Sequence, residues 1–175
     1  LEIAKVVLEA NSGQDGIIVA LGERHEDALS IGAYAAKEKM AIILTNGTDL
    51  SYAKDFLSEK SIKEVLVIGG ENSVSKKVEE NFEKAHRIAG ENKYETATKV
   101  AEELFPETEK IALVNGNQFS DALVISSLAG KNSMPIILTE QDKLNEKAGK
   151  YIKANNIKEV EIFGGINSVS DKLFK

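Results

Sequence analysis

Residues 40–45, Met-Ala-Ile-Ile-Leu-Thr, return later in the chain as Met-Pro-Ile-Ile-Leu-Thr at residues 134–139. A second motif follows each of these stretches, Gly-Gly-Glu-Asn-Ser-Val-Ser at residues 69–75 and Gly-Gly-Ile-Asn-Ser-Val-Ser at residues 164–170. Both pairs occur in the same order and at nearly the same spacing, which is the signature of an internal repeat. The sequence therefore indicates two tandem copies of one unit.

The first copy covers residues 1–84 and the second covers residues 85–175. Helical and strand-like patterns alternate in each copy, and residues 94–104 place apolar side chains at the spacing of an amphipathic helix. Residues 87–90 form either a further strand or the connection between the copies. The remaining predicted strands are short apolar runs at residues 17–21, 41–44, 64–68, 110–114, 135–139 and 159–163.

Alternating strands and helices predict parallel sheets. The strands are almost continuously apolar, so they should be buried on both faces and covered by helices on both sides. We therefore expect an α/β fold of tandem Rossmann-like three-layer units with mostly parallel sheets. Residues 42–44 and 136–138 should be central, buried strands.

The composition excludes several classes of function. Twenty-two Lys and Arg residues against 28 Asp and Glu residues give a formal net charge of −6, which argues against a nucleic-acid partner. The sequence has no cysteine and only 2 histidines, so thiolate metal sites, disulfides and cysteine nucleophiles are excluded. No apolar run approaches the roughly 18 residues of a membrane span. We expect no cofactor and no catalytic or metal site.

The glycine motif can be interpreted in two ways. A glycine pair lets the chain leave a strand with unusual dihedral angles, and Asn72 or Ser73, like Asn167 or Ser168, can cap the next helix. The turn also lies at the carboxyl end of a parallel strand, where open α/β sheets bind ligands. Thr45 and Thr139 end their strands nearby, and their hydroxyl groups can donate hydrogen bonds to a ligand or satisfy the local backbone.

Four stretches of the second copy carry a family resemblance. They are residues 87–97, 115–123, 135–139 and 163–170, and together they resemble the type 2 cell-wall-binding repeat of Gram-positive bacteria, especially of clostridial surface proteins. The first copy resembles the family from Asp27 onward but lacks the opening Arg-Ile-Ala-Gly block. The resemblance implies a noncatalytic, extracellular anchor at the cell wall, which binds an anionic, teichoic-acid-like polymer.

The same resemblance implies partners, since such repeats usually occur as three tandem copies. A third repeat or a homo-oligomer would then complete the assembly, and an amidase, protease or adhesin can be fused to it. Two alternatives stay open. The chain can be the wall-targeting fragment of a peptidoglycan hydrolase of the N-acetylmuramoyl-L-alanine amidase type, or a ligand-free oligomerisation repeat.

An acidic protein that binds an anionic polymer needs a local cationic groove, because its net charge repels the polymer within a Debye length of about 8 Å. The candidate cations are Arg24, Arg87 and Lys93 near strand–helix junctions, helped by backbone N–H groups at helix N-termini. Replacing Arg87 or Lys93 by alanine should then weaken polymer binding and its salt dependence without unfolding the protein.

Overall fold

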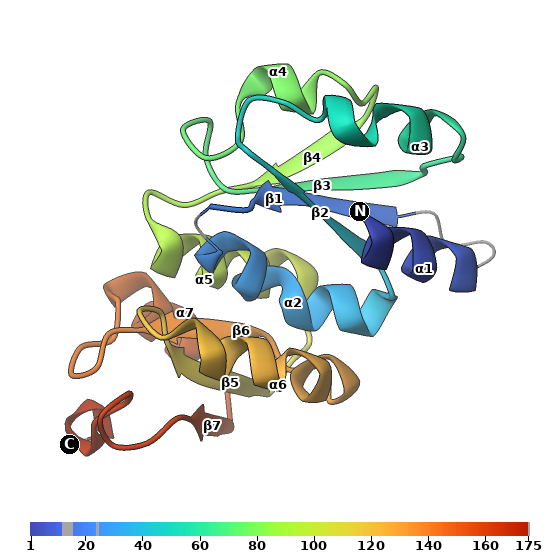
Figure 1. Ribbon diagram of the computed structural model, residues 1–175. Helices are drawn as coiled ribbons and strands as arrows, with labels where there is room; N and C mark the ends of the chain where they lie inside the picture. The colour runs from blue at the N-terminus through green and yellow to red at the C-terminus, as the bar shows by residue number, and fades with distance from the viewer. Residues whose placement is uncertain (12–15, 24, 175) are drawn as a thin grey trace.

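The computed structural model describes residues 1–11, 16–23 and 25–174 (Figure 1). Its first part contains α1 (Glu2–Ala10), β1 (Gly16–Leu21), α2 (Glu26–Glu38), β2 (Ala41–Thr45), the 3-10 turn η1 (Ser51–Ala53), α3 (Lys54–Ser58), β3 (Glu64–Ile68), α4 (Lys76–Glu79) and β4 (Ala85–Ile88). Its second part contains α5 (Lys93–Leu104), β5 (Lys110–Asn115), α6 (Phe119–Lys131), β6 (Ile136–Thr139), α7 (Glu146–Ala154), β7 (Glu159–Phe163) and the 3-10 turn η2 (Asp171–Phe174).

The strands form two parallel sheets, which confirms the expected α/β fold class. The first sheet has the order β2-β1-β3-β4 and the second has the order β6-β5-β7. Strand β4 begins just after the boundary at residues 84 and 85 and pairs with β3, so residues of the second sequence copy complete the first sheet. The boundary between the two repeats at residues 84 and 85 stays a prediction.

The two Ile-Ile-Leu-Thr strands were expected at the centres of their sheets, and this expectation is wrong. Strands β2 and β6 lie at the edges, while β1 and β5 are central. Residues 136–138 are buried all the same, because helices cover both faces of β6. Leu44 of β2 is 49% exposed, since its side chain lines an open hollow.

Helices cover both faces of each sheet, as the apolar strands predict. The prediction of burial is wrong for the edge strand β7, because none of its residues is buried and Ile162 is 44% exposed. The outer face of the first sheet packs against α1, α3 and α4, and its inner face packs against α2 and α5. The second sheet packs against α2 and α6 on one face and against α5 and α7 on the other. Figure 1 shows α2 and α5 as a helical layer between the two sheets. The two units therefore share part of their cores.

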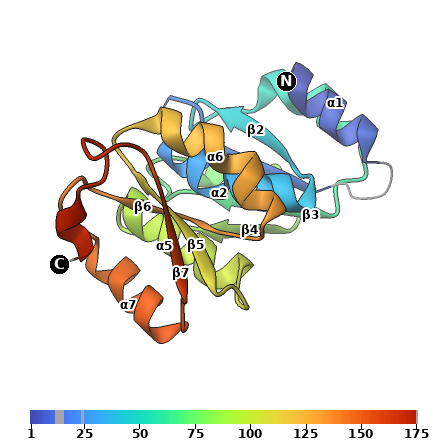
Figure 2. The same cartoon turned by 90° about the horizontal axis from the view of Figure 1, so that it is seen from below.

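Helices α2 and α6 cross in close contact, and Figure 2 shows them side by side. Small residues make this approach possible. A Cβ atom added at Gly130 of α6 would lie 2.5 Å from the carbonyl oxygen of Ala33 and 2.7 Å from the Cβ of Ala36. The contact leaves no space for even a methyl group, so Gly130 sets the distance between the two units.

We expect Gly130→Ala to lower the free energy of unfolding by about 1–3 kcal/mol, because the new methyl group overpacks the helix crossing. Gly149 of α7 is the matched control, since a Cβ atom there would approach nothing closer than 3.7 Å. Gly149→Ala should stabilise the protein by about 0.5–1 kcal/mol through helix propensity. Urea denaturation of both variants measures the difference, and equal stabilities would contradict the packing argument.

Candidate functional site

Both glycine motifs lie at the carboxyl ends of their sheets, directly after β3 and β7. Gly69 and Gly164 have φ angles of 103° and 123°, which favour glycine over any other residue. A Cβ atom at Gly69 would lie 2.5 Å from Asp27 Oδ2, and one at Gly164 would lie 2.7 Å from Asp121 Oδ2. Each repeated Asp in the first turn of a helix therefore packs against the repeated glycine of the same unit.

The residues after the glycines shape the turn rather than cap a helix. Ser73 and Ser168 donate their backbone N–H groups to Gly70 and Gly165 at 2.9 and 2.8 Å. The expected capping by Asn72 or Ser73 is wrong, because the residue that precedes α4 is Ser75 and no side chain there bonds to the helix. In the second unit Ser168 is buried, and its hydroxyl contacts the side chain of Gln118.

Asn72 and Asn167 of the same turns are exposed, so both can reach a ligand. Thr45 and Thr139 are buried and hold the neighbouring turns. Thr45 Oγ1 donates to the Asp49 carbonyl at 2.7 Å, and Thr139 Oγ1 lies 3.0 and 3.1 Å from the carbonyl oxygens of Glu140 and Lys143. A ligand contact by either threonine would require these turns to open.

Arg87 on β4 is held by groups of the first unit. Its Nη2 and Nε atoms lie 2.7 and 3.0 Å from Glu79 Oε2, and its Nη1 donates to the Gly69 carbonyl at 2.7 Å. The side chain is only 16% exposed. Arg87 therefore fixes the glycine turn to α4, so its removal also removes structural support. Arg24, the other predicted arginine, lies outside the described residues.

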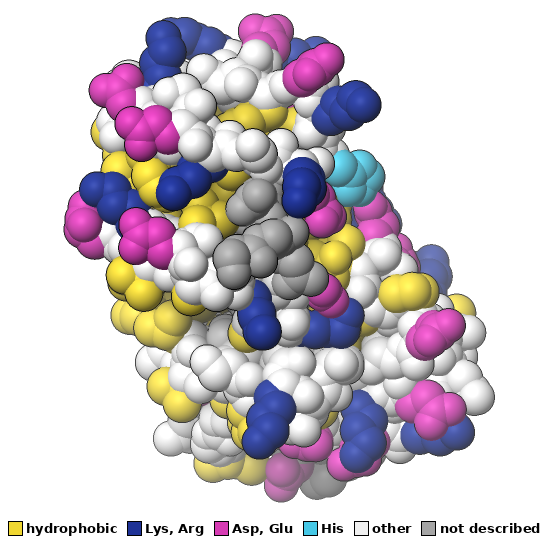
Figure 3. Space-filling model, turned by 90° about the vertical axis from the view of Figure 1, so that its right-hand side faces the viewer, with side chains coloured by type: hydrophobic (Ala, Val, Ile, Leu, Met, Phe, Trp, Pro, Cys, Tyr) yellow, Lys and Arg dark blue, Asp and Glu magenta, His cyan; other side chains and the backbone are white. Residues whose placement is uncertain are grey.

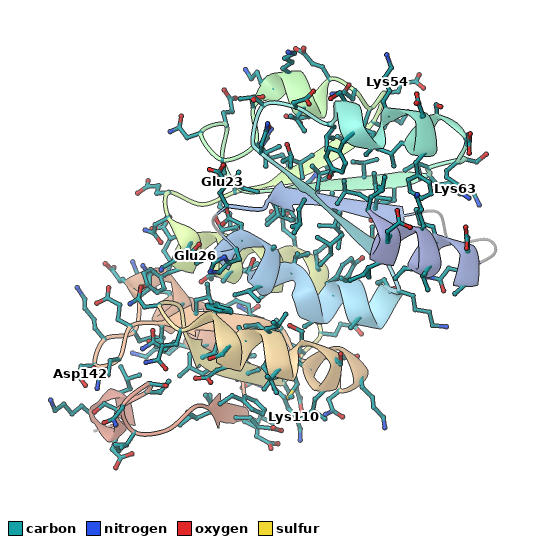
Figure 4. The ribbon with its side chains drawn as sticks, viewed as in Figure 1. Glu23, Glu26, Lys54, Lys63, Lys110 and Asp142 are labelled. Carbon is teal, nitrogen blue, oxygen red and sulfur yellow. The ribbon has the colours of Figure 1, made fainter. Side chains whose placement is uncertain are left out.

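Lys93 joins the two units. Its Nζ atom donates to the Gly116 carbonyl and to Asn117 Oδ1, both at 2.8 Å, and lies 3.3 Å from Glu26 Oε1. Figure 4 shows Glu26 at the start of α2, on the side of that helix toward the second unit. Partial burial alone would raise the pKa of Glu26, but a backbone hydrogen bond and the Lys93 ammonium group lower it. The Glu26 carboxyl group is therefore ionised near neutral pH.

A cleft of about 760 Å³ lies beside the first glycine turn and the start of α5. Its charged lining residues are Glu26, Asp27, Glu71, Glu91 and Lys93. The lining is predominantly acidic, and its one lysine is already paired. Such a cleft repels an anion rather than attracting it.

The described residues include no cluster of three or more His, Cys, Asp or Glu side chains that could hold a metal ion. No helix among them is long and apolar enough to cross a membrane. Sequence reasoning missed a group of lysines around α3, since no motif marks them.

The chain is a tandem-repeat α/β protein, in which each unit has a glycine turn at the carboxyl end of its parallel sheet. The chain belongs to the family "Cell wall binding domain 2 (CWB2)", whose model matches residues 1–79 and 87–174. This match confirms the two tandem cell-wall-binding repeats that the sequence resembles. Family membership indicates a cell-wall-binding chain that is targeted to the cell surface.

Two similar proteins come from Bacillus subtilis (strain 168). N-acetylmuramoyl-L-alanine amidase LytC of Bacillus subtilis (strain 168) is 30% identical over 173 residues, covering 98% of this chain and 35% of LytC. The amidase enhancer of the same strain is 31% identical over 160 residues, covering 89% of this chain and 22% of that protein. The chain thus spans about a third or less of these two relatives.

Two solved structures share the fold. Cwp6 from Clostridium difficile has a TM-score of 0.87 and 28% identity, covering 98% of this chain and 28% of Cwp6. Cwp8 from the same organism has a TM-score of 0.85 and 28% identity, covering 99% of this chain and 30% of Cwp8. The similarity extends over both repeats.

We expect Gly69→Ala to destabilise the protein by about 1–3 kcal/mol, because alanine is strained at this positive φ angle and its methyl group meets Asp27. Gly70→Ala is the control, since a Cβ atom at Gly70 would have no neighbour within 4 Å. Thermal unfolding followed by circular dichroism compares the two variants. A loss of the same size in Gly70→Ala would refute the role of the Asp27 contact.

Proposed function

We propose that this chain anchors a surface protein noncovalently to the Gram-positive cell wall by binding an anionic, teichoic-acid-like polymer. The match of the cell-wall-binding family to both repeats carries the proposal. A fused amidase, protease or adhesin would supply any enzymatic or adhesive activity. The similarity to LytC favours one alternative in particular, a wall-targeting segment of an N-acetylmuramoyl-L-alanine amidase.

The candidate contacts divide into two kinds. Asn72 and Asn167 are exposed and can donate hydrogen bonds to sugar hydroxyl groups. Arg87 and Lys93 are already bonded to carboxylates and carbonyl groups within the protein. A polymer phosphate at either cation must therefore compete with these internal partners, which lowers the net gain from binding. We keep Arg24, Ser73, Ser168, Thr45 and Thr139 as further candidate contacts.

Sedimentation with purified Gram-positive cell walls tests the proposal. The chain should pellet with intact walls and should stay in the supernatant when hydrofluoric acid has removed their phosphate-containing polymers. Binding to the polymer through cations should also weaken as salt rises, because each contact releases counterions. Equal pelleting with extracted and intact walls would refute an anionic polymer as the ligand.

The contact between the units is not symmetric, and this bears on the proposed partners. Helix α2 inserts Leu29 and Ala33 into the core between α5, α6 and β6 of the second unit. The equivalent groove of the first unit, between α1, α2 and β2, is an open hollow of about 1090 Å³. Leu123 of α6, which corresponds to Leu29 in the repeat, is 60% exposed at the edge of this hollow.

A head-to-tail contact of this kind leaves one donor helix and one acceptor groove unused. We propose that a further copy of the unit occupies this groove and inserts the helix face that carries its equivalent of Leu123. In a longer chain this copy is a third repeat, and in the isolated chain it is a second molecule. The open groove is lined mainly by apolar side chains, which fits an apolar helix face rather than a charged polymer.

The isolated chain should therefore self-associate with rising concentration, and Leu123→Glu should shift it toward the monomer by placing a charge in the contact. Ile166→Glu is the control, since Ile166 is apolar and 58% exposed but lies in the second glycine turn, outside the lining of the groove. Analytical ultracentrifugation measures the association. Self-association that persists unchanged in Leu123→Glu would refute this contact, and self-association without wall binding would favour the oligomerisation repeat.

A further inference from the structure

A second hollow, of about 620 Å³, lies on the outer side of the first unit, between α3 and the loop that precedes β4. Lys54, Lys60, Lys63 and Lys84 line it, together with only two acidic residues, Asp49 and Glu83. Figure 3 shows the side of the molecule that carries α3, where lysine side chains lie beside apolar atoms. Lysines thus outnumber acids here, in a protein with a net charge of −6.

Three of these lysines, Lys54, Lys60 and Lys84, can offer their charged ammonium groups to a ligand. No ion pair among the described residues involves Lys54, Lys60 or Lys84, whereas most of the other lysines pair with carboxylates. The Lys60 ammonium group lies 5.5 Å from the centre of the Phe56 ring, which orients its stem without neutralising its charge. This setting differs from those of Arg87 and Lys93, whose charges are matched internally.

The hollow also has an apolar part. Leu57, Ile62 and Phe82 are half-buried and line it beneath the lysines. Apolar and aromatic surfaces accept the C–H faces of sugar rings, while ammonium groups attract phosphate oxygens. One hollow therefore offers both kinds of contact that a phosphate-bearing glycan needs. Figure 4 labels Lys54 at the start of α3, on the outer side of the first sheet, and Lys63 just before β3.

The second repeat lacks this arrangement. The repeated Ile-Lys-Glu-Val stretch aligns Lys63 with Lys158 and Lys60 with Asn155. Lys158 pairs with Glu109 at 2.6 Å, so its charge is matched. Because the two repeats share their fold and their glycine turns, the scaffold does not require the lysines of the first repeat.

We propose that the hollow between α3 and the loop before β4 binds a glycan that carries phosphate groups. Lys54, Lys60 and Lys84 contact the phosphates, and Ile62 and Phe82 support the sugar rings. This inference rests on the proposed binding of an anionic wall polymer, and it assigns that polymer to a surface remote from the acidic cleft beside the first glycine turn.

Calorimetric titration with oligo(glycerol phosphate) and sedimentation with intact walls test the assignment. For the double variant Lys54→Gln/Lys84→Gln, the dissociation constant for the oligomer should rise about tenfold, and the salt dependence of binding should decrease, because two exposed charge contacts are lost.

The control is Lys143→Gln/Lys153→Gln, which changes the net charge by the same amount at two exposed lysines of the second unit. This control should bind the oligomer like the wild type. Lys54→Arg/Lys84→Arg should retain binding. Circular dichroism verifies that all variants are folded.

The outcomes separate the two proposals. Undiminished binding by folded Lys54→Gln/Lys84→Gln, with wild-type binding intact, would overturn the assignment to this hollow and leave the anchoring function standing. An equal loss in the Lys143→Gln/Lys153→Gln control would also overturn it, since net charge rather than position would then determine affinity. A wild-type chain that binds neither the oligomer nor intact walls would overturn both proposals.

Discussion

Helix α2 serves two cores at once, and the arrangement of the molecule depends on this packing. Ile31 and Ala35 face the inner side of the first sheet, while Leu29 and Ala33 enter the core of the second unit. A helix buried on two sides cannot move away from one sheet without exposing apolar surface to water. The close helix crossing at Gly130 adds a second contact, so the two repeats share part of their hydrophobic cores.

This packing also determines where a polymer can bind. It places the first turn of α2 beside α5, where Lys93 and Glu26 form an ion pair between the units. The cleft at the carboxyl ends of the strands of the first sheet is the usual ligand position in open α/β sheets. The ion pair neutralises the only lysine among the described residues that line this cleft, so acidic side chains remain in excess there. Binding of an anion is better served by the outer side of the sheet, where Lys54, Lys60 and Lys84 form no ion pair with any described residue.

The sequence predicted the local structure well, because apolar periodicity reports burial directly. Strands β3 and β7 have the predicted bounds, and the glycine turns lie at the predicted edge of each sheet. The order of the strands in each sheet was not predictable, because an apolar run indicates that a strand is buried but not which strands pair with it. The partners of Arg87 and Lys93 were not predictable either, since Glu79 and Glu26 come close only in the folded chain.

The two repeats divide their residues into those that maintain the fold and those that distinguish one copy from the other. The paired Asp27 and Gly69 recur as Asp121 and Gly164 because each turn needs the same close contact. Lys60 of the hollow beside α3 aligns with Asn155 instead, so this cation is not repeated in the second unit. The residues that recur in both repeats are therefore those that the fold needs. At positions where the two repeats have different residues, the binding specificity can differ between the copies without disturbing the fold.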